Sequence, residues 1–245
     1  MVALANRSSS LRARQDGVVE GFLELLWPTR CIGCEKPGAL LCPSCFVALP
    51  FIDRALACER CGAPFGTLLC TECNTADGPR EFAFTQAACA FEFKDIVARM
   101  IVAYKDQSER RLAPLLARFV QQALPPEWQR WADAISYIPC DRRALRKRGF
   151  DHMQHLAAAS ADLVGLPAVA LLRKGASTDQ RKLGRAGREE NMTTAFSADE
   201  RVAMPRHVLL LDDVFTTGAT LDAASRVLLA AGAAEVRVAS VARVW

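Results

Sequence analysis

The cysteines of this chain are concentrated in one short segment. Eight of the ten lie between Cys31 and Cys73, in a chain of 245 residues. They form two aligned repeats, CIGCEKPGALLCPSC (31–45) and CERCGAPFGTLLCTEC (58–73). Each repeat holds a C-x-x-C pair, a turn rich in Gly and Pro, the tripeptide Leu-Leu-Cys and a second C-x-x-C pair. We therefore expect a small Cys-rich unit over 27–78, separate from the domain that follows.

Repeated C-x-x-C pairs indicate metal binding. Two such pairs joined by a hairpin can place four thiolates at the corners of a tetrahedron, the geometry of a closed zinc site. We expect one structural Zn²⁺ per repeat, although an interleaved pairing satisfies the same sequence. A disulfide framework is the alternative, but no secretory signal is visible and a reducing cytosol keeps thiols free for metal. The expected ligands are Cys31, Cys34, Cys42, Cys45, Cys58, Cys61, Cys70 and Cys73.

The role of this unit has two interpretations. A structural brace or protein contact is favoured, because only Lys36, Arg54 and Arg60 are basic between the first and last of its cysteines. Contact with nucleic acid is the alternative, since zinc knuckles often serve it. Cys89 and Cys140 have no partners at ligand spacing, and we expect them in the core.

The distribution of apolar residues along the chain predicts a protein without membrane-spanning helices. Half of the residues are apolar, yet no apolar run approaches the roughly 20 residues needed to cross a bilayer. Residues 1–26 are expected to form a leader and a short amphipathic helix, because Glu20 and Glu24 interrupt the apolar stretch that a secretory signal requires. We expect a cytoplasmic protein. The net charge of +4 is too mild to indicate nucleic-acid binding by itself.

From residue 82 to 245, strands and helices alternate. This pattern predicts a parallel sheet with helices on both faces, and ligands then bind at the carboxyl ends of the strands. The expected strands are 87–93, 134–139, 169–172, 207–212 and 236–241, and the expected helices are 96–104, 112–124 and 221–231, with PPEW closing the second helix.

One strand end carries an explicit pattern. The strand 208–211 finishes in Asp212 and Asp213, and the next loop, which holds Thr216, Thr217 and Gly218, leads into a helix that starts near Ala219 or Thr220. Amide groups at a helix N-terminus favour an anion, so a phosphate fits there. The acidic pair suits sugar hydroxyls, directly or through Mg²⁺ and its water. Phosphate and sugar side by side describe a ribose 5-phosphate.

Two further segments are polar and basic. The strand ending at Pro139 is followed by five cations suited to a polyanionic leaving group with Mg²⁺, although a solvated helix face is the alternative. These are Arg142, Arg143, Arg146, Lys147 and Arg148. The stretch 173–196 is long and charged, as lids often are, and a disordered connector is its alternative.

These motifs carry a resemblance to known families. DDVFTTGAT resembles the motif of type I phosphoribosyltransferases that binds 5-phosphoribosyl 1-pyrophosphate (PRPP), and nearly the whole chain from Trp27 resembles the ComF family, phosphoribosyltransferase-like proteins tied to natural competence and the use of external DNA. The family's basic motif R-x-x-R-x-R-G-F-N-Q is met by Arg143, Arg146, Arg148, Gly149 and Phe150, with Asp151 and His152 where Asn and Gln are usual. Its lid pattern is met by Gln180, Leu183, Arg188, Asn191, Ala195 and Phe196, and its Tyr-Lys by Lys105.

The resemblance implies a set of roles. Asp212 and Asp213 would meet the ribose hydroxyls near the reacting carbon. The 5-phosphate would bind at Thr216, Thr217, Gly218, Ala219 and Thr220, the pyrophosphate at Arg143, Arg146, Arg148 and Gly149, and the lid would use Gln180, Arg188 and Asn191. Mg²⁺ would accompany PRPP. No covalent nucleophile is needed, and we expect no catalytic role for His152, His155 or His207.

Two functions from different classes follow from the sequence. The first is an enzyme that transfers phosphoribosyl from PRPP to an acceptor that no motif identifies. The second is a non-catalytic scaffold that senses PRPP and works on single-stranded DNA or competence proteins through its zinc unit and basic segments, which could follow a phosphate backbone.

Overall fold

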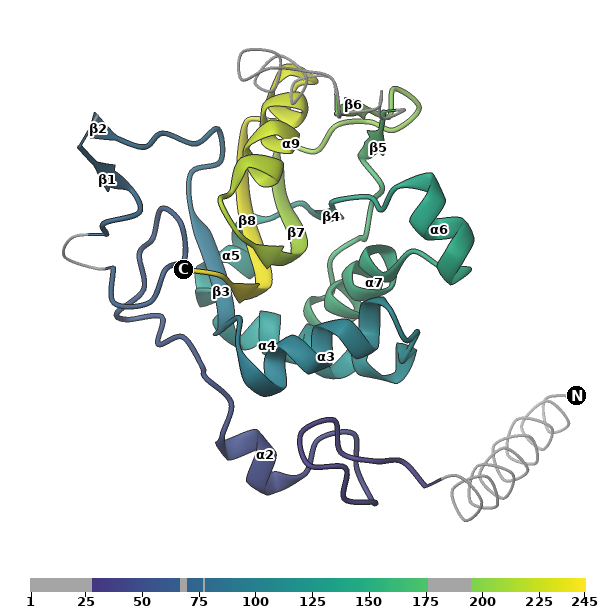
Figure 1. Cartoon of the computed structure of the whole chain (residues 1–245). Coiled ribbons are helices and arrows are strands. Elements are labelled where there is room, and N and C mark those ends of the chain that lie inside the picture. Colours follow the sequence, from purple (N-terminus) through teal and green to yellow (C-terminus); the bar gives the residue numbers. More distant parts are fainter. Residues whose placement is uncertain (1–27, 67–69, 77, 176–194) are drawn as a thin grey trace, which may run out of the picture. The chain divides into compact units, whose positions relative to one another are not determined.

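The computed structural model describes residues 28–66, 70–76, 78–175 and 195–245 (Figure 1). The chain divides into two compact units between Leu49 and Pro50, and the expected Cys-rich segment 27–78 spans this division. The expected leader helix lies outside the described residues. Within those residues, no helix is both long and apolar enough to cross a membrane.

The first unit contains the first cysteine repeat. A tight turn is closed by the amide of Cys31, which donates to the carbonyl of Lys36 at 2.9 Å. A second hydrogen bond joins the amide of Ile32 to the carbonyl of Leu40. The one-turn helix α2 (Pro43–Val47) then begins with a proline in its first turn, where the missing N–H costs nothing. So short a segment holds few apolar contacts, which leaves its cysteines as the main stabilising groups.

The second repeat belongs to the second unit. Residues 50–59 run along the outer edge of strand β3 (Ala87–Glu92). The amide of Ile52 donates to Ala90, the amide of Ala87 donates to Glu59, and the amide of Glu92 donates to Pro50. The short strands β1 (Asn74–Thr75) and β2 (Gly78–Pro79) pair antiparallel directly after the last cysteine. The segment 50–59, which leads into the second repeat, therefore covers a sheet edge that would otherwise expose unpaired backbone groups.

Four parallel strands form the central sheet, in the order β3-β8-β7-β4 (Figure 1). Strand β4 spans Ala134–Tyr137, β7 spans His207–Phe215 and β8 spans Glu235–Arg243. We expected β7 to end at the acidic pair, but it runs on to Phe215, because Asp212 and Val214 still pair with Ser240 and Ala242 of β8.

Both faces of the sheet are covered by helices, as the sequence pattern predicts. Val208 and Leu210 of β7 share an apolar cluster with Leu221 and Leu228 of helix α9 (Ala219–Ala230). The alternate residue Leu209 is equally buried and points to the other face, because side chains alternate along a strand. On that face, α4 (Ala113–Ala123) contacts β3 and β8, and α7 (His152–Val164) contacts β4 and β7.

The remaining elements connect these layers. They are α3 (Asp95–Lys105), the 3₁₀ turn η1 (Arg110–Leu112), α5 (Pro126–Trp131), α6 (Arg142–Arg148), and the strands β5 (Leu172–Lys174) and β6 (Phe196–Ala198), which pair antiparallel. We expected PPEW only to end the preceding helix. Pro126 instead starts α5, since proline is favoured in the first turn of a helix. Trp128 of this helix is buried beneath the sheet residue Arg237.

Candidate functional site

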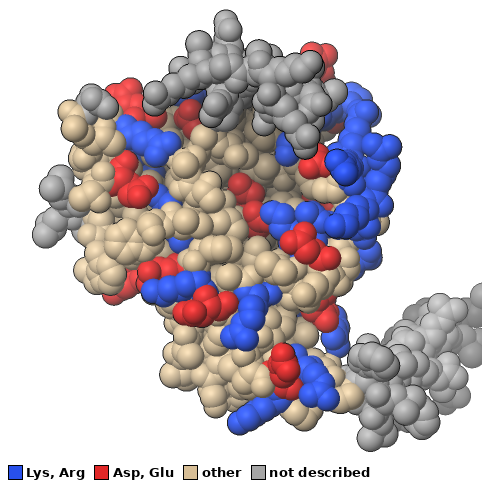
Figure 2. Space-filling view, in the orientation of Figure 1, with Lys and Arg blue, Asp and Glu red and all other residues tan. Residues whose placement is uncertain are grey.

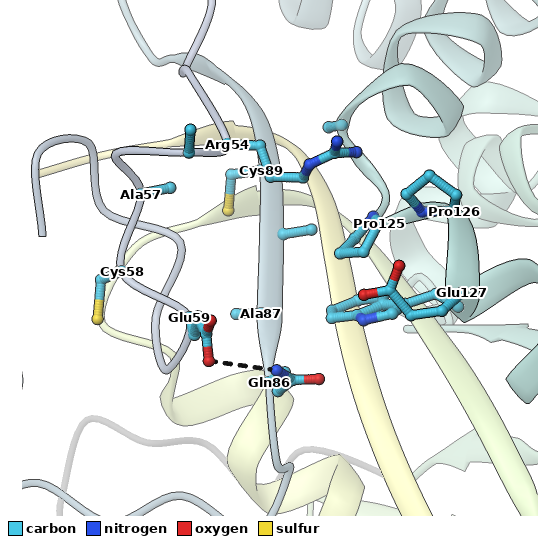
Figure 3. A pocket seen from close by; sticks show the side chains of 14 residues that line it. Arg54, Ala57, Cys58, Glu59, Gln86, Ala87, Cys89, Pro125, Pro126 and Glu127 are labelled. Carbon is cyan, nitrogen blue, oxygen red and sulfur yellow. Dashed lines mark hydrogen bonds between the residues drawn. The ribbon is translucent and has the colours of Figure 1, made fainter. Parts of the chain in front are cut away.

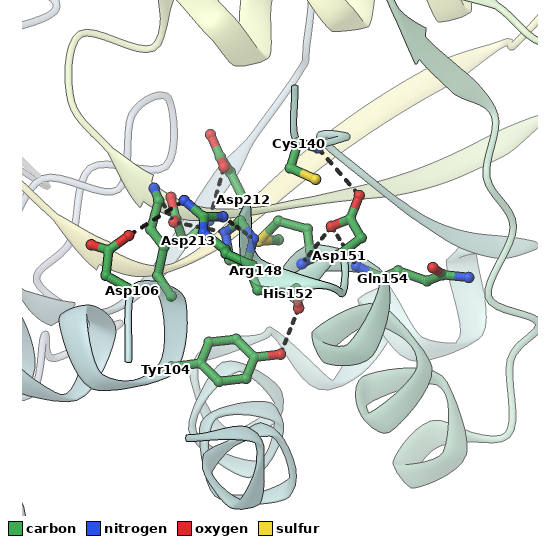
Figure 4. Close-up of polar contacts among 11 residues, drawn as sticks. Tyr104, Asp106, Cys140, Arg148, Asp151, His152, Gln154, Asp212 and Asp213 are labelled. Carbon is green, nitrogen blue, oxygen red and sulfur yellow. Dashed lines mark hydrogen bonds and ion pairs between the residues drawn. The ribbon is translucent and has the colours of Figure 1, made fainter. Parts of the chain in front are cut away.

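The acidic pair lies at the carboxyl-terminal part of β7. Asp213 is 7% exposed and its Oδ2 atom has two partners. The Nζ atom of Lys105 donates to it at 2.6 Å, and the Nε2 atom of His152 lies 3.1 Å away (Figure 4). Asp212 is half-buried, and its Oδ1 atom accepts the amide of Asp213 at 2.9 Å.

The two carboxyl groups have opposite electrostatic environments. Burial opposes ionisation of Asp213, but the His152 hydrogen bond and the charge of Lys105 outweigh it and hold the pKa of Asp213 well below its ordinary value. Burial and the charge of Asp213 raise the pKa of Asp212. Asp213 thus has its counter-ions in place, whereas Asp212 is half-buried in the cavity lining with its pKa raised to about 8, and it can exchange hydrogen bonds with a ligand hydroxyl there.

His152 joins the acidic pair to the basic helix. Its Nδ1 atom lies 3.0 Å from a guanidinium nitrogen of Arg148. Arginine can only donate, so Nδ1 accepts and the protonated Nε2 donates to Asp213. Arg148 also contacts Asp106 at 3.4 Å. No role was expected for His152 from the sequence, and its signal there was its place at the end of the basic motif, where the ComF pattern has Gln.

Asp151 caps the helix that carries this histidine. Its Oδ1 atom accepts the amides of Met153 and Gln154, and its Oδ2 atom accepts the amide of Cys140 (Figure 4). A carboxylate at a helix N-terminus is favourable, so the aspartate that replaces the usual Asn makes the cap itself. Cys140 lines the cavity instead of the core; burial and Asp151 raise the pKa of its thiol to about 12, which keeps it protonated at neutral pH.

The loop after β7 turns into α9 at Gly218. This glycine has φ +79°, and an added Cβ would lie 2.7 Å from the ring of Phe215 and 2.9 Å from that of Phe82. Only glycine fits both the backbone conformation and the space. Gly218, the N-cap residue of α9, has no side chain that could cap the helix. The amide of Ala219 has only a long contact, to the hydroxyl of Thr217 at 3.4 Å. The amides at its N-terminus are therefore available to an anion.

A cavity of about 330 Å³ brings the loop, the acidic pair and part of the basic helix together. Its polar lining residues include Lys105, Asp141, Arg148, His152, Lys174, Asp212, Asp213, Thr216 and Thr220. Thr217 is exposed beside it. Phosphate donors and carboxylates thus face one space large enough for a sugar phosphate.

The predicted pyrophosphate residues separate into two groups. Arg148 lines the cavity, and Gly149 ends α6 with φ +75°. Arg143 and Arg146 are exposed on α6 and do not line the cavity. Figure 2 shows the outer face of this helix as a blue surface at the right of the molecule. The predicted lid residues Gln180, Arg188 and Asn191 lie outside the described residues, between β5 and β6.

The cysteines of each repeat come together in space, one cluster per repeat. In each cluster the four Sγ atoms lie within 4.8 Å of one another. Cys34 and Cys42 are 3.6 Å apart at sulfur, and Cys61 and Cys70 are 3.5 Å apart. Tetrahedral Zn–S bonds of about 2.3 Å place sulfurs about 3.8 Å apart. Both clusters therefore fit a structural Zn²⁺.

A second cavity, of about 310 Å³, lies at the opposite end of the sheet (Figure 3). It is lined by the start of β3, by residues 54–59 and by the start of α5. Glu59 and Gln86 are hydrogen-bonded across it at 3.5 Å. Since ligands of parallel sheets bind at the carboxyl ends of the strands, this space is separate from the site at Asp213.

Comparison with known proteins supports both halves of this description. Residues 22–75 match the model of a double zinc ribbon domain. The competence protein ComFC of Streptococcus pneumoniae is 27% identical over 211 residues, covering 85% of this chain and 83% of that protein. The DNA utilization protein YhgH of Escherichia coli is 28% identical over 222 residues, covering 86% and 95%. Alignments of this length include parts of both the Cys-rich segment and the α/β unit.

Solved structures are also similar to part of this chain, and one of them serves as an example. It is the glutamine PRPP amidotransferase from B. subtilis in complex with ADP and GMP, at 24% identity and a TM-score of 0.37. The match covers 54% of this chain and 25% of that enzyme.

Proposed function

The chain belongs to the ComF family, and from this membership we propose that it binds PRPP and acts as a phosphoribosyltransferase-like protein in DNA uptake or the use of external DNA. The competence and DNA-utilization names of its relatives support the biological setting. The chemistry rests on the site itself.

One observation carries the proposal: the anion-ready N-terminus of α9, the acidic pair and Arg148 open into the same cavity. PRPP has three chemical groups, and each is complementary in charge or hydrogen bonding to one of these three parts of the site. The 5-phosphate would take the amides of the loop 216–220, the ribose hydroxyls would donate to Asp212 and Asp213, and the pyrophosphate would lie against Arg148. Few other ligands carry two anionic groups on either side of a diol.

The side chains also suit the reaction of such a ligand. When the bond from C1 to the pyrophosphate breaks, positive charge builds on the ribose and negative charge on the leaving group. The buried carboxylate of Asp213 would stabilise the first, and Arg148 the second. An acceptor nitrogen would then attack C1. The carboxyl group of Asp212, whose proton a bound Mg²⁺ would displace, and the substrate phosphates would offer the oxygen donors that Mg²⁺ prefers. The ion would supply further neutralisation of the leaving group.

Calorimetric titration with Mg²⁺ tests this assignment part by part. PRPP should bind more tightly than ribose 5-phosphate or pyrophosphate alone, because it occupies every part of the cavity. Arg148→Met should weaken PRPP by about tenfold or more, the order expected for a lost charged hydrogen bond, and should leave ribose 5-phosphate nearly unchanged. Arg143→Met is the matched control, since Arg143 lies on the same helix outside the cavity. If the two variants weakened PRPP binding equally, Arg148 would not be the residue that contacts the pyrophosphate.

A second function is favoured by the outer face of α6. Arg142, Arg143, Arg146 and Lys147 are exposed, and in the described ranges none of the four is paired with a carboxylate. This face suits a scaffold that senses PRPP while holding single-stranded DNA. The two functions differ in their readout: turnover of PRPP with release of pyrophosphate supports the enzyme, whereas DNA binding that falls steeply with salt, without turnover, supports the scaffold.

A further inference from the structure

The last residue of β8 is a buried cation. Arg243 is 1% exposed, although an arginine side chain is almost never fully buried without partners. Its guanidinium donates to the carbonyl of the adjacent Val244 and also to acceptors on two other segments of the second unit. One segment is the second cysteine repeat, and the other is the loop that follows β7.

Towards the cysteine repeat, the Nε atom donates to the carbonyl of Cys61 at 3.0 Å, and Nη2 donates to Oε2 of Glu72 at 3.1 Å. Cys61 is a member of the second cluster, and Glu72 lies between two other members, Cys70 and Cys73. Both acceptors are therefore fixed in space by the chain that wraps the cluster.

Towards the phosphate loop, Nη1 donates to the carbonyl of Thr216 at 2.7 Å, and the guanidinium carbon lies 4.6 Å from the centre of the Phe215 ring. In a trans peptide the carbonyl and the following N–H point in opposite directions. Anchoring the carbonyl of Thr216 therefore aims the amide of Thr217 away from the guanidinium. Phe215 in turn packs against the space that Gly218 leaves open.

The guanidinium is planar, and its donors form a rigid fork. If the acceptors on one side move, the fork cannot keep its geometry on the other side. A buried cation without partners is energetically costly. The Arg243 side chain would therefore adopt another conformation when its acceptors move. The loop would then lose the group that orients its first peptide.

We propose that Arg243 is a positioning residue through which the second cysteine cluster shapes the loop 216–218, so that metal occupancy of this cluster, and not of the first, sets the affinity of the cavity for a phosphorylated ligand. The identity of that ligand rests on the proposed function. The mechanical link between cluster and loop does not.

The test compares two cysteine variants of the full chain. Cys70→Ser and Cys34→Ser should each lower the zinc content from two ions to one, measured by mass spectrometry. Only Cys70→Ser should accelerate hydrogen exchange at the amides of Thr217 and Gly218, and only it should weaken PRPP binding by about tenfold or more. Equal effects of the two variants on the loop, or none from Cys70→Ser, would overturn the proposal.

Two further variants act without touching a cysteine. Arg243→Lys keeps the charge and loses the fork, and Glu72→Gln weakens one of its hydrogen bonds. Both should retain two zinc ions and the wild-type circular dichroism spectrum, yet both should speed exchange at the loop, with the larger effect from Arg243→Lys. If hydrogen exchange at the loop is unchanged in both variants, Arg243 does not couple the second cluster to the loop. This conclusion holds even if Cys70→Ser proves unable to fold.

The two readouts separate this inference from the proposed function. If exchange responds as expected but PRPP does not bind the wild type, the link stands and the function is wrong. If PRPP binds and exchange ignores the second cluster, the function stands and the link is wrong.

Discussion

The Nε2 atom of His152 lies 3.1 Å from Oδ2 of Asp213, and its Nδ1 atom lies 3.0 Å from Arg148. One imidazole thus connects the carboxylate proposed to face the ribose with the cation proposed to face the pyrophosphate. His152 is 4% exposed, so its ring position is set by the protein and not by solvent.

Two substitutions of His152 should distinguish the effect of its hydrogen bond to Asp213 from the effect of its side-chain volume. His152→Ala leaves a buried carboxylate with one partner fewer, and we expect PRPP binding to weaken by about 1–3 kcal/mol. His152→Gln places an amide donor there and should stay close to wild type. Calorimetry with Mg²⁺ measures both, and equal losses in the two variants would show that the contact to Asp213 has no role.

Asp151, which caps α7, should contribute to the free energy of unfolding of the protein. Asp151→Ala removes an acceptor for the amides of Met153, Gln154 and Cys140, and the free energy of unfolding should fall by about 1–2 kcal/mol. Asp151→Asn should lose less, because asparagine caps helices as well as aspartate does, although its amide nitrogen cannot accept from the amide of Cys140. Urea denaturation measures the difference. A large loss from Asp151→Asn would mean that the charge, and not the cap, is what matters.

The glycine at the start of α9 should be essential to the phosphate loop. Gly218→Ala combines left-handed backbone with a Cβ that meets Phe215 and Phe82, so the loop must shift and PRPP binding should be lost. Gly165→Ala is the matched control, since Gly165 has φ +70° with nothing within 4 Å of an added Cβ. It should cost only about 1–2 kcal/mol of backbone strain and leave binding intact. PRPP titration of both variants decides whether space or strain governs the loop.

The stability contributed by Asp199, directly after β6, should depend on pH. Hydrogen bonds from Arg201 and Arg173 hold the pKa of Asp199 below its ordinary value. A carboxyl with a depressed folded pKa stabilises the protein at pH values above the unfolded pKa, about 3.9, and the gain is lost as pH falls towards the folded pKa. Asp199→Asn should therefore be less stable than wild type at pH 7, and the gap should narrow below about pH 4. Urea denaturation at pH 7, 5, 4 and 3 checks this, and a gap independent of pH would contradict it.

Much of this arrangement could be predicted because its signals are local. The C-x-x-C spacing brings the cysteines of one repeat together, and the structure confirms one cluster per repeat. The strand, loop and helix around Thr216 follow one another in sequence, so a single motif describes them. Alternation of apolar strands and helices was enough to predict the parallel sheet.

The missed features depend on contacts between distant segments. His152 reaches Asp213 across 61 positions of sequence, and only the packing of α7 against β7 brings them together. Arg243 reaches Cys61 across 182 positions. The similarity of the two cysteine repeats also hid a difference between them. The second belongs to the α/β unit, where residues 50–59 join it to the edge of β3, and the first does not. Neither the spacing of residues nor the hydrophobic periodicity of the sequence indicates these contacts between distant segments.

The most direct test of the central claim is calorimetric titration of the zinc-loaded protein with PRPP and Mg²⁺, beside the double variant Asp212→Asn/Asp213→Asn. We expect the wild type to bind in the micromolar range and the variant to lose binding, with its zinc content and fold unchanged. Absence of binding to the wild type, or binding that the variant retains, would contradict a phosphoribosyl site at the end of β7.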